Sequence, residues 1–359
     1  NGKKETIMRA YFRLTRNSSL CVLLLMSLVE AAENSNWTID SRSLPPPAAA
    51  SDALSSALAS LPAPNIDASS QYPASADEWR AFIDAADATS LVSLELLEQT
   101  YQVDIEQDEI DGVSVYRVTP AQIAPEHQDQ LFFHVHGGAY VLGGGDNAVK
   151  EAVQVAVAAG IRALSVDYRM PPESPFPAAV DDTITVYQEA LQSYAPKAIA
   201  IGGTSTGGGL SLAAVHRMKQ LNLPLPGAVY AGTPWSDMTK TSDTLYTNEG
   251  IDRVLVTYDG LLKGAAEIYA AGTDMKDPLI SPVYGDFTGF PPTVLITGTR
   301  DLFLSDTVRV HRKMRNTGVV ADLHVFEGMS HAEYLIELGS AESTETFAEV
   351  SRFFKMHLE

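Results

Sequence analysis

Cysteine is nearly absent from this chain, which holds only Cys21 among its 359 residues. No disulfide can form within the chain, and a metal site built from several thiolates is excluded, so we expect no metal centre of that kind. Basic residues are scarce too, with 25 Lys and Arg against 45 Asp and Glu and a formal net charge of −20. Nucleic acids and anionic membranes require a basic protein surface, so neither is expected as a partner.

The apolar run at residues 20–29 is too short to span a bilayer, which takes about 20 residues. It follows Arg9, Arg13 and Arg16, and small residues around Ala31 come after it. A basic region, a short apolar region and a cleavage site are typical of a secretory signal peptide. We therefore predict that residues 1–31 are removed and that the protein is exported to the periplasm or the medium, without a stable membrane anchor.

Apolar patterning predicts an N-terminal cap followed by a core. Residues 32–75 are rich in Ser, Ala and Pro, which indicates a linker and the start of the cap, and residues 76–100 have the periodicity of a cap helix. Residues 101–234 and 282–359 alternate predicted strands and helices after a hairpin at Asp111-Gly112. This alternation predicts an α/β fold, a mostly parallel sheet of eight strands with helices on both faces.

One segment, residues 235–281, breaks the alternation because it has helical stretches but no predicted strand. We interpret it as an inserted cap segment over the carboxyl edge of the sheet, where α/β folds bind their ligands.

The stretch Gly203-Thr204-Ser205-Thr206-Gly207 joins a predicted strand to a predicted helix. This G-x-S-x-G spacing is typical of a nucleophile elbow, in which the serine occupies a strained turn and its hydroxyl is exposed at a helix N-terminus. The glycines also fit the turn that binds a dinucleotide in short-chain dehydrogenases. Such an enzyme needs a Tyr-x-x-x-Lys pair, which the chain lacks, and its glycine turn follows the first strand instead of lying mid-chain.

Three further sites complete the pattern of an acyl-transfer enzyme. His136-Gly137-Gly138 follows a predicted strand and can aim backbone N–H groups at an oxyanion, where one donor contributes ~10²–10³ in rate. Asp301 lies at the end of a late strand, whereas its rival Asp306 falls inside the next helix. Of the eight histidines, His331 is the one in a loop directly after a late strand. The order Ser205, Asp301, His331 is the order that α/β-hydrolases use.

Together these motifs resemble the bacterial hormone-sensitive lipase family (family IV, GTSAG-like subgroup), which has the α/β-hydrolase fold. The similar segments are HGGAY at 136–140, the segment 167–182, GTSTGG at 203–208, RDLFLSD at 300–306 and GMSH at 328–331. The resemblance implies a triad of Ser205, Asp301 and His331 that hydrolyses short- to medium-chain acyl esters without a cofactor. It also implies an oxyanion hole formed by the N–H groups of Gly137, Gly138 and Thr206, and it admits a homodimer.

Two residues depart from the family pattern. Ala139 replaces a glycine, and Thr206 replaces an alanine and adds a branched side chain beside the oxyanion hole. Candidate pocket walls are Tyr140, Trp235 and Met238, for which packing in the core is an equal alternative.

Three questions stay open at this point. Arg169, Glu173 and Asp182 could form an ion network behind the elbow. A small-molecule binding protein with the same fold and an amide hydrolase with the same triad both remain alternatives to an esterase.

Overall fold

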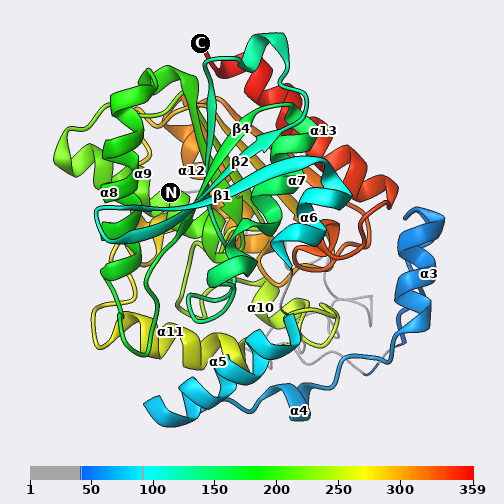
Figure 1. Ribbon diagram of the computed structural model, residues 1–359. Helices are drawn as coiled ribbons and strands as arrows, with labels where there is room; N and C mark the ends of the chain where they lie inside the picture. Colours follow the sequence, from blue (N-terminus) through cyan, green and yellow to red (C-terminus); the bar gives the residue numbers. More distant parts are fainter. Residues whose placement is uncertain (1–40, 42, 91–92) are drawn as a thin grey trace, which may run out of the picture. The chain divides into compact units, whose positions relative to one another are not determined.

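A computed structural model describes residues 41, 43–90 and 93–359 (Figure 1). The predicted signal peptide lies outside these residues. Residues 46–359 form one unit, to which all the contacts below belong. None of the helices in the described part of the chain is long and apolar enough to cross a membrane.

The core is a single sheet of eight strands in the order β1-β2-β4-β3-β5-β6-β7-β8. Its strands are β1 Val103–Ile110, β2 Val113–Pro120, β3 Leu131–Val135, β4 Arg162–Asp167, β5 Ile199–Thr204, β6 Ala228–Gly232, β7 Thr293–Gly298 and β8 Ala321–Phe326. Strand β2 pairs antiparallel with β1 and β4, and the remaining pairs are parallel. Asp111 and Gly112 form the β1–β2 turn with positive φ angles of 48° and 84°. The mostly parallel eight-stranded sheet is therefore confirmed.

Helices cover both faces of the sheet, as predicted. The larger ones are α7 Lys150–Ala159, α8 Ala178–Ser193, α9 Thr206–Leu221, α12 Leu304–Asn316 and α13 Ala341–His357. Neighbouring side chains of β3 point to opposite faces. Phe132 packs into a core with residues of α7 and α13, while Phe133 packs into a core with residues of α8, α9 and α12. Figure 1 shows α7 and α13 together on one side and α8 and α9 on the other.

The predicted cap helix at 76–100 is two helices, α5 Ala76–Ser90 and α6 Leu94–Tyr101. Ser93 caps the second helix, because its side chain accepts a hydrogen bond from the backbone N–H of Leu96. Two shorter helices precede them, α3 Asp52–Ser60 and α4 Ile66–Ser69.

The inserted segment 235–281 has no strand, and all of its residues are described. It contains α10 Thr244–Thr247, a π-helical turn at Tyr258–Leu262 and α11 Lys263–Ala270. Helix α11 packs against the N-terminal helices, since a Cβ on Gly264 would lie 3.0 Å from the ring of the buried Trp79 in α5. The two parts that we predicted as cap segments therefore contact each other.

Candidate active site

Ser205 lies between β5 and α9 with φ 63° and ψ −123°, a strained conformation for a residue other than glycine. Backbone hydrogen bonds fix this turn: Ser205 N–H donates to the Gly232 carbonyl at 2.8 Å, and the Ser205 carbonyl accepts from Trp235 N–H at 3.0 Å. Glycine is required on both sides, because a Cβ on Gly203 or Gly207 would overlap the Val135 carbonyl oxygen. The sequence pattern therefore forms the strained turn that a nucleophile elbow requires.

The loop that begins at His136 packs against this turn. A Cβ on Gly137 would lie 2.7 Å from the Thr204 carbonyl oxygen and 3.3 Å from the Ser205 Cβ, so only glycine fits there. Gly138 has φ 120°, and a Cβ on it would overlap the backbone at Leu142. Gly137, one predicted oxyanion donor, is thus next to Ser205, and Gly138 lines the same cavity as Ser205.

His136 holds the loop in place. Its ring stacks on Tyr168 with centroids 4.1 Å apart, and the Tyr168 hydroxyl donates to the His136 carbonyl at 2.8 Å. Burial lowers the pKa of His136 to about 3, so the ring is neutral at pH 7 and its Nδ1–H donates to the Gly137 carbonyl at 2.7 Å.

The third predicted donor, Thr206, is the first residue of α9, where backbone N–H groups lack helical partners. Its side chain is fully buried and does not line the cavity described below.

Asp301 and His331 come together as the sequence order predicts. The Nδ1–H of His331 donates to Oδ1 of the fully buried Asp301 at 3.1 Å. Asp301 also accepts from the Thr297 hydroxyl and the Phe303 N–H, both at 2.8 Å. The ring of Phe303 meets the His331 ring edge to face, with centroids 4.9 Å apart. The carboxylate therefore has a fixed orientation and holds the imidazole at Nδ1.

Ser205 and His331 open on one cavity of about 590 Å³. The loop at Gly137 and Gly138 also lines it. Part of its wall is formed by apolar side chains of α6, the inserted segment and the stretch after His331: Leu97, Tyr101, Leu255, Leu261, Leu262, Leu335 and Leu338. This is a site for an apolar group next to a candidate nucleophile.

The three predicted pocket walls are placed in the core instead. Tyr140 stacks on Tyr269 with centroids 3.8 Å apart, and Trp235 stacks on Phe303 at 5.6 Å. Met238 is fully buried with them, and none of Tyr140, Trp235 and Met238 lines the cavity. Their positions agree with the packing alternative.

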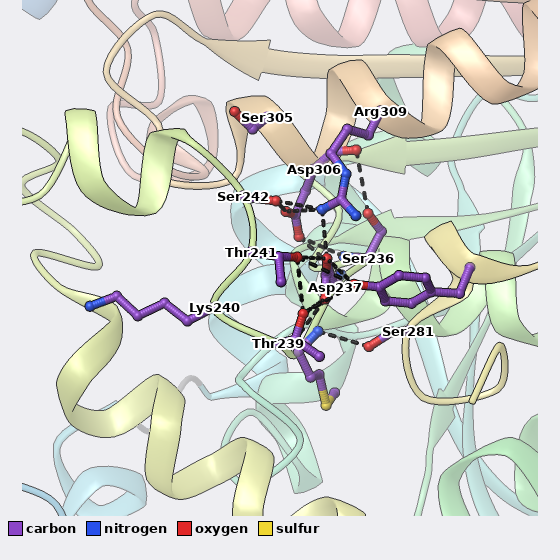
Figure 2. Close-up of polar contacts among 12 residues, drawn as sticks. Ser236, Asp237, Thr239, Lys240, Thr241, Ser242, Ser281, Ser305, Asp306 and Arg309 are labelled. Carbon is purple, nitrogen blue, oxygen red and sulfur yellow. Dashed lines mark hydrogen bonds and ion pairs between the residues drawn. The ribbon is translucent and has the colours of Figure 1, made fainter. Parts of the chain in front are cut away.

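Asp306 belongs to a separate polar cluster, which Figure 2 shows. It is fully buried in α12 and accepts from the N–H groups of Ser236 and Asp237, at 3.2 and 3.0 Å, and from the Ser242 hydroxyl. Burial, assisted by the charge of Asp237, raises the pKa of Asp306 to about 8. Arg309 pairs with Asp237 at 2.6 Å. Asp306 therefore fastens the inserted segment to α12, and Asp301 is the carboxylate bonded to the ring of His331.

The three residues expected to form one ion network behind the elbow form two separate ion pairs instead. Arg169 forms a bidentate pair with Asp182, with its shortest bond at 2.6 Å, but more than half of the Arg169 side chain is exposed. Glu173 pairs with Arg80 of α5 instead, at 2.6 Å. The expectation of a single network was wrong, because Glu173 pairs with a cation of the N-terminal helix α5.

Two carboxylates near the site carry no local sequence signal. Glu151 of α7 accepts from the Thr204 N–H at 3.1 Å and the Thr204 hydroxyl at 2.5 Å, and it pairs with His134 at 3.2 Å. Asp252 of the inserted segment accepts from the N–H groups of Leu302 and His331. Across the described residues, no group of three or more His, Cys, Asp or Glu is placed to hold a metal ion.

Comparisons with known proteins agree with this geometry. A profile of the family described as alpha/beta hydrolase fold matches residues 132–335. An acetyl-hydrolase of Streptomyces hygroscopicus is 34% identical over 223 residues, 62% of this chain and 74% of that protein. The crystal structure of an esterase is similar with a TM-score of 0.88 and 47% identity, covering 91% of this chain and 100% of the other. Another esterase, from the bacterial hormone-sensitive lipase family, has a TM-score of 0.68 and 29% identity, covering 82% and 95%.

Proposed function

The chain belongs to the hormone-sensitive lipase family of α/β-hydrolases, and on this basis we propose that it is a serine carboxylesterase with Ser205 as nucleophile. In this proposal His331 is the general base and Asp301 its carboxylate partner. The observation that carries it is the Asp301–His331 hydrogen bond of 3.1 Å, beside a cavity that His331 shares with the strained Ser205.

The proposed reaction has two halves. His331 takes the proton of Ser205, whose oxygen attacks the ester carbonyl and forms a tetrahedral intermediate. The N–H groups of Gly137, Gly138 and Thr206 stabilise its oxyanion, helped by the positive end of the α9 dipole. His331 then protonates the departing alcohol. Water activated by His331 hydrolyses the acyl-enzyme, and Asp301 stabilises the imidazolium in both halves.

The cavity favours short- to medium-chain acyl groups. Its volume of about 590 Å³ is within the range of small-molecule sites, ~300–1,000 Å³, and its leucine-rich wall suits an alkyl chain. In this proposal the inserted segment and the N-terminal helices act as the cap that excludes water from the bound acyl chain.

Labelling with a fluorophosphonate distinguishes an enzyme from a binding protein with a disarmed serine. We expect wild type to gain one adduct, mapped by mass spectrometry to Ser205, and Ser205→Ala to gain none. Ser193→Ala, which changes an exposed serine at the end of α8, should label like wild type. A wild-type protein that stays unlabelled would favour the binding protein. Comparing the matched ester and amide of one acyl group then tests the amide hydrolase.

A further inference from the structure

Asp252 belongs to the inserted segment, yet its carboxylate lies between the loops that carry Asp301 and His331. It is fully buried. Its Oδ2 accepts a hydrogen bond from Leu302 N–H at 2.9 Å and a longer one from His331 N–H at 3.3 Å. Leu302 directly follows Asp301, so one oxygen atom joins the backbone of both loops.

The other oxygen of Asp252 organises the cavity wall. Oδ1 accepts from the N–H groups of Val254 and Leu255, at 2.8 and 3.1 Å, and both of these residues line the cavity that contains Ser205. Four backbone donors therefore converge on one carboxylate, and they come from three separate stretches of chain.

Arg253 adds a second attachment to the histidine loop. Its N–H donates to the Ser330 hydroxyl at 3.2 Å, next to His331. Its guanidinium pairs with Glu333 and, at 2.5 Å, with Glu337, so its charge is directed at carboxylates beyond the loop. The inserted segment is thus fixed to the histidine loop at two adjacent residues.

The charges around Asp252 tie it to the triad. Burial, the largest cause, and the charge of Asp301 raise the pKa of Asp252 to about 6. The charge of His331 lowers this pKa. Asp301 and His331 are the titratable groups with the largest effect on this pKa. Ionised Asp252 is therefore a second negative charge near the imidazole.

We propose that Asp252 is a positioning residue for the hydrolytic reaction: it holds the Asp301 and His331 loops at their working separation and couples the inserted segment to the triad. This inference rests on the proposed triad. Small displacements of catalytic groups are costly, since a shift of about 1 Å can reduce the rate about 100-fold.

The first test is Asp252→Asn, which keeps the shape of the side chain but loses its charge and one acceptor oxygen. We expect kcat on p-nitrophenyl butyrate to fall about 10- to 100-fold, in line with other supporting residues, with KM within about threefold. In a plot of kcat/KM against pH, the acid limb should move to lower pH, because the variant lacks one negative charge that stabilises the imidazolium. Asp243→Asn, at an exposed aspartate of the same segment, should match wild type.

A double-mutant cycle separates positioning from general stability. If Asp252 acts through the Asp301–His331 pair, Asp252→Asn should lower kcat much less in an Asp301→Asn background than in wild type. Circular dichroism and thermal melts establish that each variant is folded. Unchanged kcat and an unchanged acid limb in folded Asp252→Asn, or equal losses in both backgrounds, would overturn the inference. If Asp301→Asn itself keeps wild-type activity, the proposed triad fails instead.

Discussion

At the scale of single residues, the site depends on close backbone contacts that only small residues allow. Ser205 has a strained φ of 63°, and its backbone hydrogen bonds to Gly232 and Trp235 hold it there. Such strain costs ~1–3 kcal/mol and is retained where it exposes a reactive group.

Gly207→Ala tests this packing. The added methyl group would overlap the Val135 carbonyl oxygen, so we expect the free energy of unfolding to fall by about 1–3 kcal/mol and esterase activity to be lost. Gly318 has φ 80° and open space around it, so Gly318→Ala should cost about 1 kcal/mol and keep activity. Urea unfolding and initial rates check both variants. If Gly207→Ala and Gly318→Ala lose equal stability and equal activity, the close backbone contact at the elbow is not critical.

Asp306 gives a pH-dependent prediction at the same scale. Because the pKa of Asp306 is raised to about 8, the folded state binds its proton more tightly than the unfolded state does. The contribution of this proton to stability is therefore present at low pH and is lost as pH rises through about 8.

Asp306→Asn stays neutral and should remove this dependence. Relative to Asp306→Asn, the unfolding free energy of wild type should decrease between pH 5 and pH 9, as measured by urea titration. Asp243→Asn serves as a control that keeps the wild-type trend. A constant difference between wild type and Asp306→Asn would contradict a raised pKa.

At the scale of elements, the inserted segment lines two cavities. Val254, Leu255, Leu261 and Leu262 line the cavity with Ser205 and also line a second, largely apolar cavity of about 470 Å³ under the N-terminal helices. The same four side chains therefore separate the two cavities.

Truncating one of these side chains should shift the preference towards substrates with longer acyl chains. Leu262→Ala would join the two spaces, so we expect the ratio of kcat/KM for octanoate over butyrate nitrophenyl esters to rise about tenfold, the effect of one or two methylene contacts. Leu245→Ala removes an equally buried leucine of the same segment that lines neither cavity. It should leave the ratio unchanged. A similar ratio in both variants would mean that this wall does not limit chain length.

At the scale of the whole molecule, the sheet brings distant parts of the chain to one edge. Ser205 follows β5, Asp301 follows β7 and His331 follows β8. Because these strands are parallel members of one sheet, all three groups lie at the same edge, at the carboxyl ends of the strands. The formal charge of −20 is spread over a chain whose predicted substrates are uncharged esters. We attribute this surplus of acidic residues to solubility.

The sequence predicted what is encoded locally. Strand and helix periodicity and the Asp111-Gly112 turn indicated the sheet, and the spacing around Ser205 indicated the elbow. It could not predict Asp252 and Glu151, because their bonds to His331 and Thr204 span 79 and 53 residues and follow no motif. Tyr140 belongs to the HGGAY motif and Trp235 begins the inserted segment, but aromatic side chains pack equally well in a core, and sequence position does not give their direction.

The most direct test of the central claim is the initial rate on nitrophenyl esters with acyl chains of two to sixteen carbons, for wild type and Ser205→Ala side by side. We predict that wild type cleaves the short and medium esters and that Ser205→Ala loses ~10⁴–10⁶ in rate, as expected for loss of a nucleophile. A near-normal rate in the folded Ser205→Ala variant would contradict the assignment of the nucleophile, and with it the proposed mechanism.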